Sequence, residues 1–247
     1  MPIKMFSQSY SLFNTLFFSI LFVSFLTPCI SQEKNFTDEQ GRKQGFWSKN
    51  FENGKTRYEG NFKDNLPTGL FKYWHENGNL KVEMNYFNEN QCQVSLYNVD
   101  GKHIADGFYY NQVKDSLWRY FDDNTGNRVS EEFYRKDIPY KQWIVFYSDG
   151  KTPSEIYNYD KGKKEGLQTT FFENGQKKEQ WTCQKSVITG DVTYYHPNGK
   201  VRCNGQYEND VPVGIWTYFD EDGKITVKDH YENGKVIQTE DFEEKTE

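Results

Sequence analysis

The sequence predicts an all-β protein, an elongated antiparallel β-meander of about eight repeats, each about 24 residues long and built from two strands. Glycines recur at nearly constant spacing, and the strand-like segments between them carry aromatic residues at alternate positions. The chain is 18% aromatic although only 35% hydrophobic, which suits pleated sheets better than helix cores. No segment sustains a 3.6-residue apolar period, so we expect essentially no helix beyond the N-terminal segment.

The first 31 residues are typical of a secretory signal peptide. Lys4 precedes an apolar stretch at residues 12–25, and Pro28 and the small residue Ser31 follow. We expect cleavage after Ser31, so the protein is exported to the periplasm, the cell envelope or the medium. Two alternatives stay open, and only these would attach the protein to a membrane. The first is an uncleaved anchor, although the apolar run falls short of the ~20 residues that span a bilayer. The second is lipid attachment at Cys29.

The charge balance bounds the partners of the mature chain. Lys4 is the only charged residue before position 32, which leaves 29 Lys and Arg against 36 Asp and Glu, a net charge of −7. Such a chain is a poor general partner for nucleic acid or an anionic membrane.

A turn glycine marks each repeat from residue 32 to 239. Eight such glycines follow one another at spacings of 24, 23, 25, 24, 25, 24 and 24 residues. Several lie in pairs such as Asn53-Gly54, and an Asn-Gly pair between strand-like runs is a strong hairpin signal because both residues accept a positive φ. The turn glycines are Gly54, Gly78, Gly101, Gly126, Gly150, Gly175, Gly199 and Gly223.

The strands of each hairpin carry aromatic residues at fixed positions. A second glycine, such as Gly45 or Gly69, opens the first strand nine residues before the turn glycine. Rings follow two and four residues later, on one face of the strand. They form either a binding platform for glycans and peptides or a staple between neighbouring strands. The candidate binding residues are Trp47, Phe71, Tyr73, Trp118, Trp143, Trp216 and Tyr218.

Some copies depart from the pattern. The third, fourth and fifth have Cys92, Ser116 and Lys141 in place of the opening glycine, so curvature or specificity could change there. The second strand has a ring or a sulfur eight residues after the turn glycine in every copy but one, which has Asn158. The acidic tail, residues 240–247, is expected to be disordered.

Units such as Gly214-Ile-Trp-Thr-Tyr-Phe-Asp-Glu-Asp-Gly-Lys224 and Tyr231-Glu-Asn-Gly-Lys235 resemble the MORN-repeat variant found in YwqK-type antitoxin components. The resemblance covers about residues 38 to 236. It implies a β-meander used for protein contacts and, for the antitoxin branch, neutralisation of a toxin by binding. An export signal is unexpected for a guard against an intracellular toxin.

No pattern of residues predicts catalysis, so we expect a protein that is not an enzyme, with no cofactor and no metal. The four histidines lie in distant units, and no Gly-rich phosphate loop, catalytic triad order or CxxC pair is present. One register of the second strand is acidic and forms either an anionic stripe or a solvated face. Its residues are Glu59, Glu83, Asp106, Glu131 and Glu155.

The expected function is therefore that of a protein-interaction scaffold, with a carbohydrate-binding module of the cell envelope as the alternative. Export leaves Cys92, Cys183 and Cys203 where disulfides are permitted. In a continuous meander one strand runs between Cys183 and Cys203, which places them ~9.6 Å apart, beyond the reach of a disulfide. We expect three free thiols.

Overall fold

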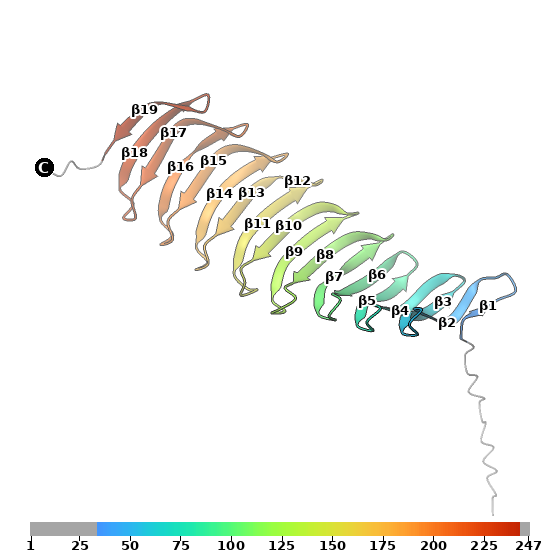
Figure 1. The fold of residues 1–247 in the computed structure, drawn as a ribbon. Coiled ribbons are helices and arrows are strands. Elements are labelled where there is room, and N and C mark those ends of the chain that lie inside the picture. The colour runs from blue at the N-terminus through green and yellow to red at the C-terminus, as the bar shows by residue number, and fades with distance from the viewer. Residues whose placement is uncertain (1–33, 243–247) are drawn as a thin grey trace, which may run out of the picture. The chain divides into compact units, whose positions relative to one another are not determined.

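The computed structural model describes residues 34–242, so the predicted signal peptide and residues 243–247 of the acidic tail lie outside the described residues. The described residues form one antiparallel sheet whose strands follow one another in chain order (Figure 1). Its 19 strands are β1 (Phe36–Thr37), β2 (Lys43–Asn50), β3 (Thr56–Lys63), β4 (Leu66–Trp74), β5 (Leu80–Asn88), β6 (Gln91–Tyr97), β7 (His103–Tyr110), β8 (Val113–Phe121), β9 (Arg128–Arg135), β10 (Ile138–Phe146), β11 (Pro153–Asp160), β12 (Lys163–Lys164), β13 (Gly166–Phe171), β14 (Lys177–Gln184), β15 (Val187–Tyr195), β16 (Val201–Glu208), β17 (Val211–Phe219), β18 (Ile225–Glu232) and β19 (Lys235–Asp241).

The predicted all-β meander of eight hairpins is confirmed. The hairpins run from β2–β3 to β17–β18, and each strand pairs with the next along the chain. Three further strands are present because β1 and β19 flank the array and because β12 and β13 are two parts of one interrupted strand paired with β11. Since β19 extends to Asp241, the first two residues assigned to the disordered tail belong to the sheet. The described residues contain no helix able to cross a membrane.

The turn glycines all lie in the left-handed region, with φ from 68° at Gly150 to 95° at Gly78. In the first hairpin the Gly54 amide donates to the Phe51 carbonyl at 3.0 Å, and the Phe51 amide donates to the Lys55 carbonyl at 2.8 Å. The asparagine before the glycine does not have a positive φ, so our expectation for that residue is wrong. The geometry is that of a type I turn followed by a left-handed glycine.

Two-residue turns close the opposite margin of the sheet, where one hairpin passes to the next. Both central residues have positive φ in these turns, for example Asp64 (53°) and Asn65 (69°), as in a type I′ turn. The exception is the turn between β5 and β6, where Glu89 and Asn90 do not have positive φ. Lys185 and Ser186 adopt this strained conformation without glycine.

Polar side chains join neighbouring units along both margins. The Asn53 amide donates to the Glu76 carbonyl of the next turn at 3.0 Å, while its oxygen accepts from the Lys55 amide at 3.0 Å. At the other margin the Asn65 oxygen accepts from the Lys43 amide at 2.8 Å. These bonds fix the spacing between units that are otherwise joined only by the sheet. Further turn residues bond to the next turn in the same way: Asn77, Asn127, Asn174 and Asn198.

An extra residue in the fifth hairpin explains the exceptional Asn158. There the Tyr147 amide bonds to the Thr152 carbonyl, two residues after the turn glycine instead of one. The insertion shifts β11 by one position, so Tyr159 takes the place of the missing ring and lies 4.8 Å from Trp143. It also moves Glu155, which pairs with Val145 and Thr170 and so leaves the acidic register in which we had placed it.

The buried residues lie on one face, which we call the inner face. Large and small residues alternate there across neighbouring strands: a Cβ on Gly107 would overlap the ring of Trp118, which is fully buried. The same fit of glycine to ring occurs at Gly60 with Phe71 and at Gly205 with Trp216.

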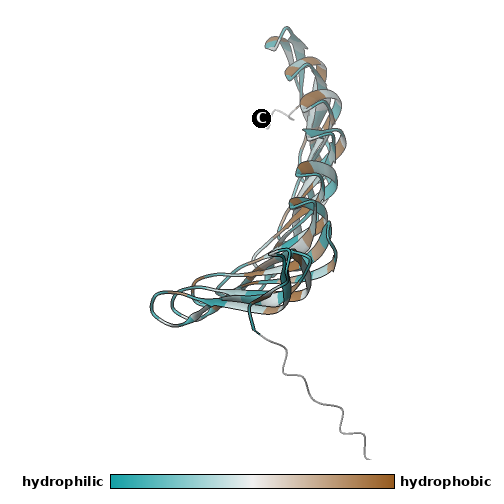
Figure 2. Ribbon diagram, turned by 90° about the vertical axis from the view of Figure 1, so that its right-hand side faces the viewer, coloured by the Kyte–Doolittle hydropathy of each residue, from teal (hydrophilic) through white to brown (hydrophobic). Residues whose placement is uncertain are grey.

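Where the ring is replaced by valine, the paired residue is large instead. Met84 pairs with Val94, and Trp181 pairs with Val192. Volume is thus conserved in these contacts, which join one hairpin to the next, as close packing requires. Figure 2 shows short hydrophobic segments distributed along the whole array.

Candidate functional site

The rings predicted to bind ligands lie on the inner face, where three of the seven form the core. Phe71, Trp118 and Trp216 expose 1%, 0% and 6% of their surface. Rings buried to this degree cannot stack on a ligand, so these three hold strands together. The remaining four, Trp47, Tyr73, Trp143 and Tyr218, are half-buried.

Contacts between rings support the interpretation of the inner column as a staple. Trp216 packs edge-on against Tyr207 at 5.2 Å and against Tyr231 of the next strand at 5.7 Å. The Trp118 indole N–H donates to the Phe108 carbonyl at 3.0 Å. Such pairs add about 0.5 to 1.5 kcal/mol each beyond the area they bury.

Burial also sets the protonation of this face. It raises the pKa of Tyr86 to about 12 and the pKa of the Cys203 thiol to about 11. The pKa values of Cys92 and Cys183 are raised for the same reason. These groups are therefore protonated at neutral pH. All three cysteines are buried and unbridged, and β15 lies between Cys183 on β14 and Cys203 on β16, as expected.

The opposite, outer face carries a continuous row of cross-strand partners that we call the central row. Its N-terminal half is charged and pairs within itself. Lys72 bonds to Glu83 at 3.1 Å, and Arg119 lies between Asp106 at 3.4 Å and Glu131 at 3.3 Å. The acidic register predicted from the sequence is therefore a ladder of ion pairs from Glu83 to Glu131. In chain order the row is Ser48, Glu59, Lys72, Glu83, Ser95, Asp106, Arg119, Glu131, Ile144, Ile156, Thr169, Gln180, Thr193, Asn204, Thr217, Lys228 and Glu240.

The C-terminal half of the central row is uncharged from Thr169 to Thr217. The Gln180 side-chain amide donates to the Thr169 hydroxyl at 3.3 Å, so these two side chains bond to each other. Thr193, Asn204 and Thr217 have no side-chain hydrogen bond within the described residues. Beside them lie Tyr195 and Phe219, half-buried rings on β15 and β17.

An exposed aromatic patch lies on the outer face where the second unit meets the third. Phe87 and Phe108 expose 58% and 39% of their surface and stack at 6.5 Å with 25° between the ring planes. Tyr110 lies beside them, 36% exposed. A hollow of about 250 Å³ lies between these rings and Asp115.

The patch exists because the third unit opens differently from the others. Cys92 does not have the positive φ of the opening glycines, and it pairs regularly with Tyr86. The irregularity lies instead at Phe87, which is passed over between Tyr86 and Asn88 as a β-bulge. Bulges redirect side chains and occur often beside functional sites.

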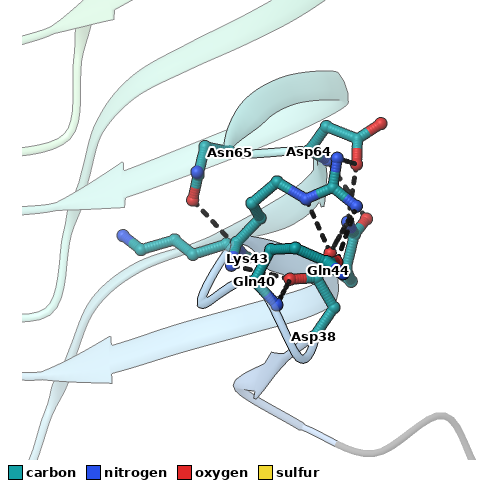
Figure 3. Close-up of polar contacts among 7 residues, drawn as sticks. Asp38, Gln40, Lys43, Gln44, Asp64 and Asn65 are labelled. Atoms are coloured by element: carbon teal, nitrogen blue, oxygen red, sulfur yellow. Dashed lines mark hydrogen bonds and ion pairs between the residues drawn. The ribbon is translucent and has the colours of Figure 1, made fainter.

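A polar cluster closes the N-terminal end of the array (Figure 3). The Asp38 carboxylate accepts from Arg42 Nε at 2.8 Å and from Gln44 Nε2 at 2.9 Å. Arg42 also pairs with Asp64 at 2.9 Å. Desolvation alone would raise the pKa of Asp38, but the hydrogen bonds from Gln44 and Arg42 outweigh it and hold that pKa at about 2. The cluster ties β1 to the first repeat and acts as a terminal cap.

No three metal-ligating side chains come together among residues 34–242. The histidines at the turns serve the backbone instead: His75 contacts the Tyr97 carbonyl at 3.3 Å and His196 the Phe219 carbonyl at 2.9 Å.

Comparison with known families identifies the hairpins. Five segments match the MORN repeat variant, at residues 43–64, 67–88, 164–182, 188–209 and 212–233. The chain carries MORN-variant repeats. The matched segments coincide with the first two and the last three hairpins, and the three middle hairpins fall between them. Phe87 lies at the end of the second matched segment, whereas Phe108 and Tyr110 lie in the first of the unmatched hairpins. No curated protein matches the chain significantly.

Sequence reasoning missed the outer face of these MORN-variant repeats. Rings five residues after the opening position occupy it in seven consecutive units, and in four of these units the outer ring directly follows an inner-face ring. An aromatic pair such as Tyr194-Tyr195 was the available signal, since neighbouring residues of a strand point to opposite faces. The outer rings are Trp74, Tyr97, Phe121, Phe146, Phe171, Tyr195 and Phe219.

Proposed function

We propose that this MORN-variant protein is an exported, non-enzymatic scaffold that binds another protein through the aromatic patch between its second and third units. The observation that carries the proposal is the stacked pair Phe87 and Phe108, exposed on the outer face, whereas Phe71, Trp118 and Trp216 of the inner face are buried. Exposed aromatic side chains beside a hollow are typical anchors of protein interfaces. Export is supported by the signal-like segment that ends at Ser31.

The position of the patch supports this function. It lies where the second matched repeat meets the first unmatched hairpin, and Phe87 itself lies on a β-bulge. A rigid array with a local irregularity suits a scaffold in which the repeats supply stiffness and the irregular junction supplies specificity. If the partner is a toxin, the protein acts as an antitoxin or immunity protein, and the same surface would carry the neutralising contact.

The alternative placed on the inner tryptophan column, a carbohydrate-binding platform, loses its support because Trp118 and Trp216 are buried.

A photo-crosslinking amino acid tests the contact surface. Tagged protein is expressed in its native host with the crosslinker at position 108 or, as a control, at position 167, where Leu167 is 48% exposed on the outer face. We expect N-terminal sequencing to begin at Gln32 and position 108 to give one discrete crosslinked protein. That product should disappear in Phe87→Ser but persist in Leu167→Ser. Identical products from both positions, or a product that Phe87→Ser leaves intact, would contradict the proposal.

A further inference from the structure

We propose a second binding site, distinct from the aromatic patch between the second and third units: the outer face of the seventh and eighth units binds a neutral linear polysaccharide. Tyr195 and Phe219 supply the stacking rings, and Thr193, Asn204 and Thr217 supply the hydrogen bonds. This inference does not depend on the proposed protein partner, since the two sites lie in different units.

The contrast within the central row is the first observation. In the N-terminal half, each charged residue of the row from Lys72 to Glu131 has an ionic partner on a neighbouring strand. Ser95 is the one uncharged residue in that stretch of the row. At the same register in the C-terminal half, Asn204 is exposed, and Thr193 and Thr217 are half-buried. Within the described residues, none of these three side chains makes a hydrogen bond. Free donors and acceptors on three consecutive strands are available to a ligand.

The spacing of these groups is the second observation. Thr193 and Thr217 lie on β15 and β17, two strands apart, which corresponds to ~9.6 Å across the sheet. Tyr195 and Phe219 each lie two residues after the threonine of the same strand, so the two rings repeat with the same period. The ligand must therefore be extended and periodic, with apolar faces and polar edges. A linear polysaccharide has this form, because its pyranose rings stack on aromatic side chains while its hydroxyls bond to amides and hydroxyls, and roughly two pyranoses span such a period.

Charge selects among polysaccharides. The row is uncharged from Thr169 to Thr217, and the nearest acid on the same face, Asp191, already accepts from Gln206 at 2.9 Å. A sulfated or uronic acid chain would meet this carboxylate and a single cation, Lys228, at one end of the strip, so the site favours a neutral glycan. In an extended peptide the groups that point to one side repeat every two residues, ~6.6 Å, which does not match the spacing of the threonines.

Binding of defined oligosaccharides tests the site. The mature protein is titrated calorimetrically with β-linked glucose and N-acetylglucosamine hexasaccharides and with their disaccharides. We expect one hexasaccharide to bind and its disaccharide to bind at least about tenfold more weakly, because only the longer chain contacts both units. The double variant Thr193→Val and Thr217→Val keeps shape and strand propensity, and it should weaken hexasaccharide binding by about tenfold through two lost hydrogen bonds.

The matched control is Ser95→Val, on the same row in the third unit, which should bind like the wild type. Tyr195→Val should weaken binding without affecting the protein crosslinked at position 108. Absence of binding to every neutral hexasaccharide, or equal binding by wild type and the threonine variant, would overturn the proposal. So would loss of the crosslinked protein in the threonine variant, which would make this strip part of the protein interface.

Discussion

Replacing Gly107 with methionine should destabilise the array by about 3 kcal/mol, because overfilling a packed core costs about 1 to 3 kcal/mol and the Trp118 ring lies directly on this glycine. Trp118→Val alone should cost about 3 kcal/mol or more, since it leaves a cavity where a buried ring was. Both values follow from one property of the inner face, the matching of large with small residues in contacts that join one hairpin to the next. Free energies of unfolding from denaturant titration measure them.

Combining the two changes should restore much of the loss. The double variant Gly107→Met with Trp118→Val recreates the pair that the protein already uses at Met84 and Val94. We expect a favourable coupling energy of about 2 kcal/mol in the double-mutant cycle, within the range for residues in contact. Gly69→Ala serves as a control, since open space surrounds that glycine and only its positive φ resists the change. Additive effects of the two substitutions would refute the pairing rule.

The second large effect concerns Gln168, which occupies a ring position but is fully buried. Its Oε1 accepts from the Asn158 amide at 2.9 Å, and its Nε2 donates to the Gly166 carbonyl at 2.9 Å. The side chain thus replaces ladder bonds where the strand is interrupted between β12 and β13. Gln168→Leu should cost about 3 kcal/mol, because the backbone groups of Asn158 and Gly166 would be buried without these partners.

Thermal unfolding measures this effect against a control glutamine. Gln142 is exposed on β10, and Gln142→Leu should change stability by no more than about 0.5 kcal/mol. Equal melting temperatures for the two variants would show that Gln168 does not hold the interrupted strand.

The repeat and its turns were predictable because they depend on local chemistry. Only glycine accepts the left-handed conformation at little cost, so Gly54 and its seven counterparts mark the hairpins directly in the sequence. Alternation of rings then places residues such as Trp118 and Trp143 on one face. The eight hairpins follow without any knowledge of long-range contacts.

The candidate site was harder to predict because exposure in a single-layer sheet depends on neighbours in other units. Trp118 is covered because Gly107, eleven residues away on the preceding strand, lets the ring reach the backbone. Phe87 lies on the outer face at the end of β5, where a β-bulge interrupts the pairing with β6. The one-residue insertion before Thr152 likewise reversed the face of Glu155, which a fixed 24-residue count could not detect.

Two-residue turns were recognised as turns but not as strained ones. Lys185 and Ser186 have positive φ although neither residue favours it. The reason lies in the next unit: the Ser186 hydroxyl accepts from the Lys164 amide at 3.0 Å, so the contact between units holds the conformation.

The central claim is that the chain forms one open layer in which each unit contacts only its neighbours, and thiol counting tests it most directly. Cys183 and Cys203 lie on strands separated by β15, too far apart for a disulfide. The mature protein, denatured without reductant, should give about three thiols per chain. In the folded protein at pH 8 they should react slowly, because burial raises the pKa of each thiol, that of Cys203 to about 11. A value near one thiol in the denatured protein would mean that two of the cysteines meet, that the sheet folds back on itself, and that the open single-layer array is wrong.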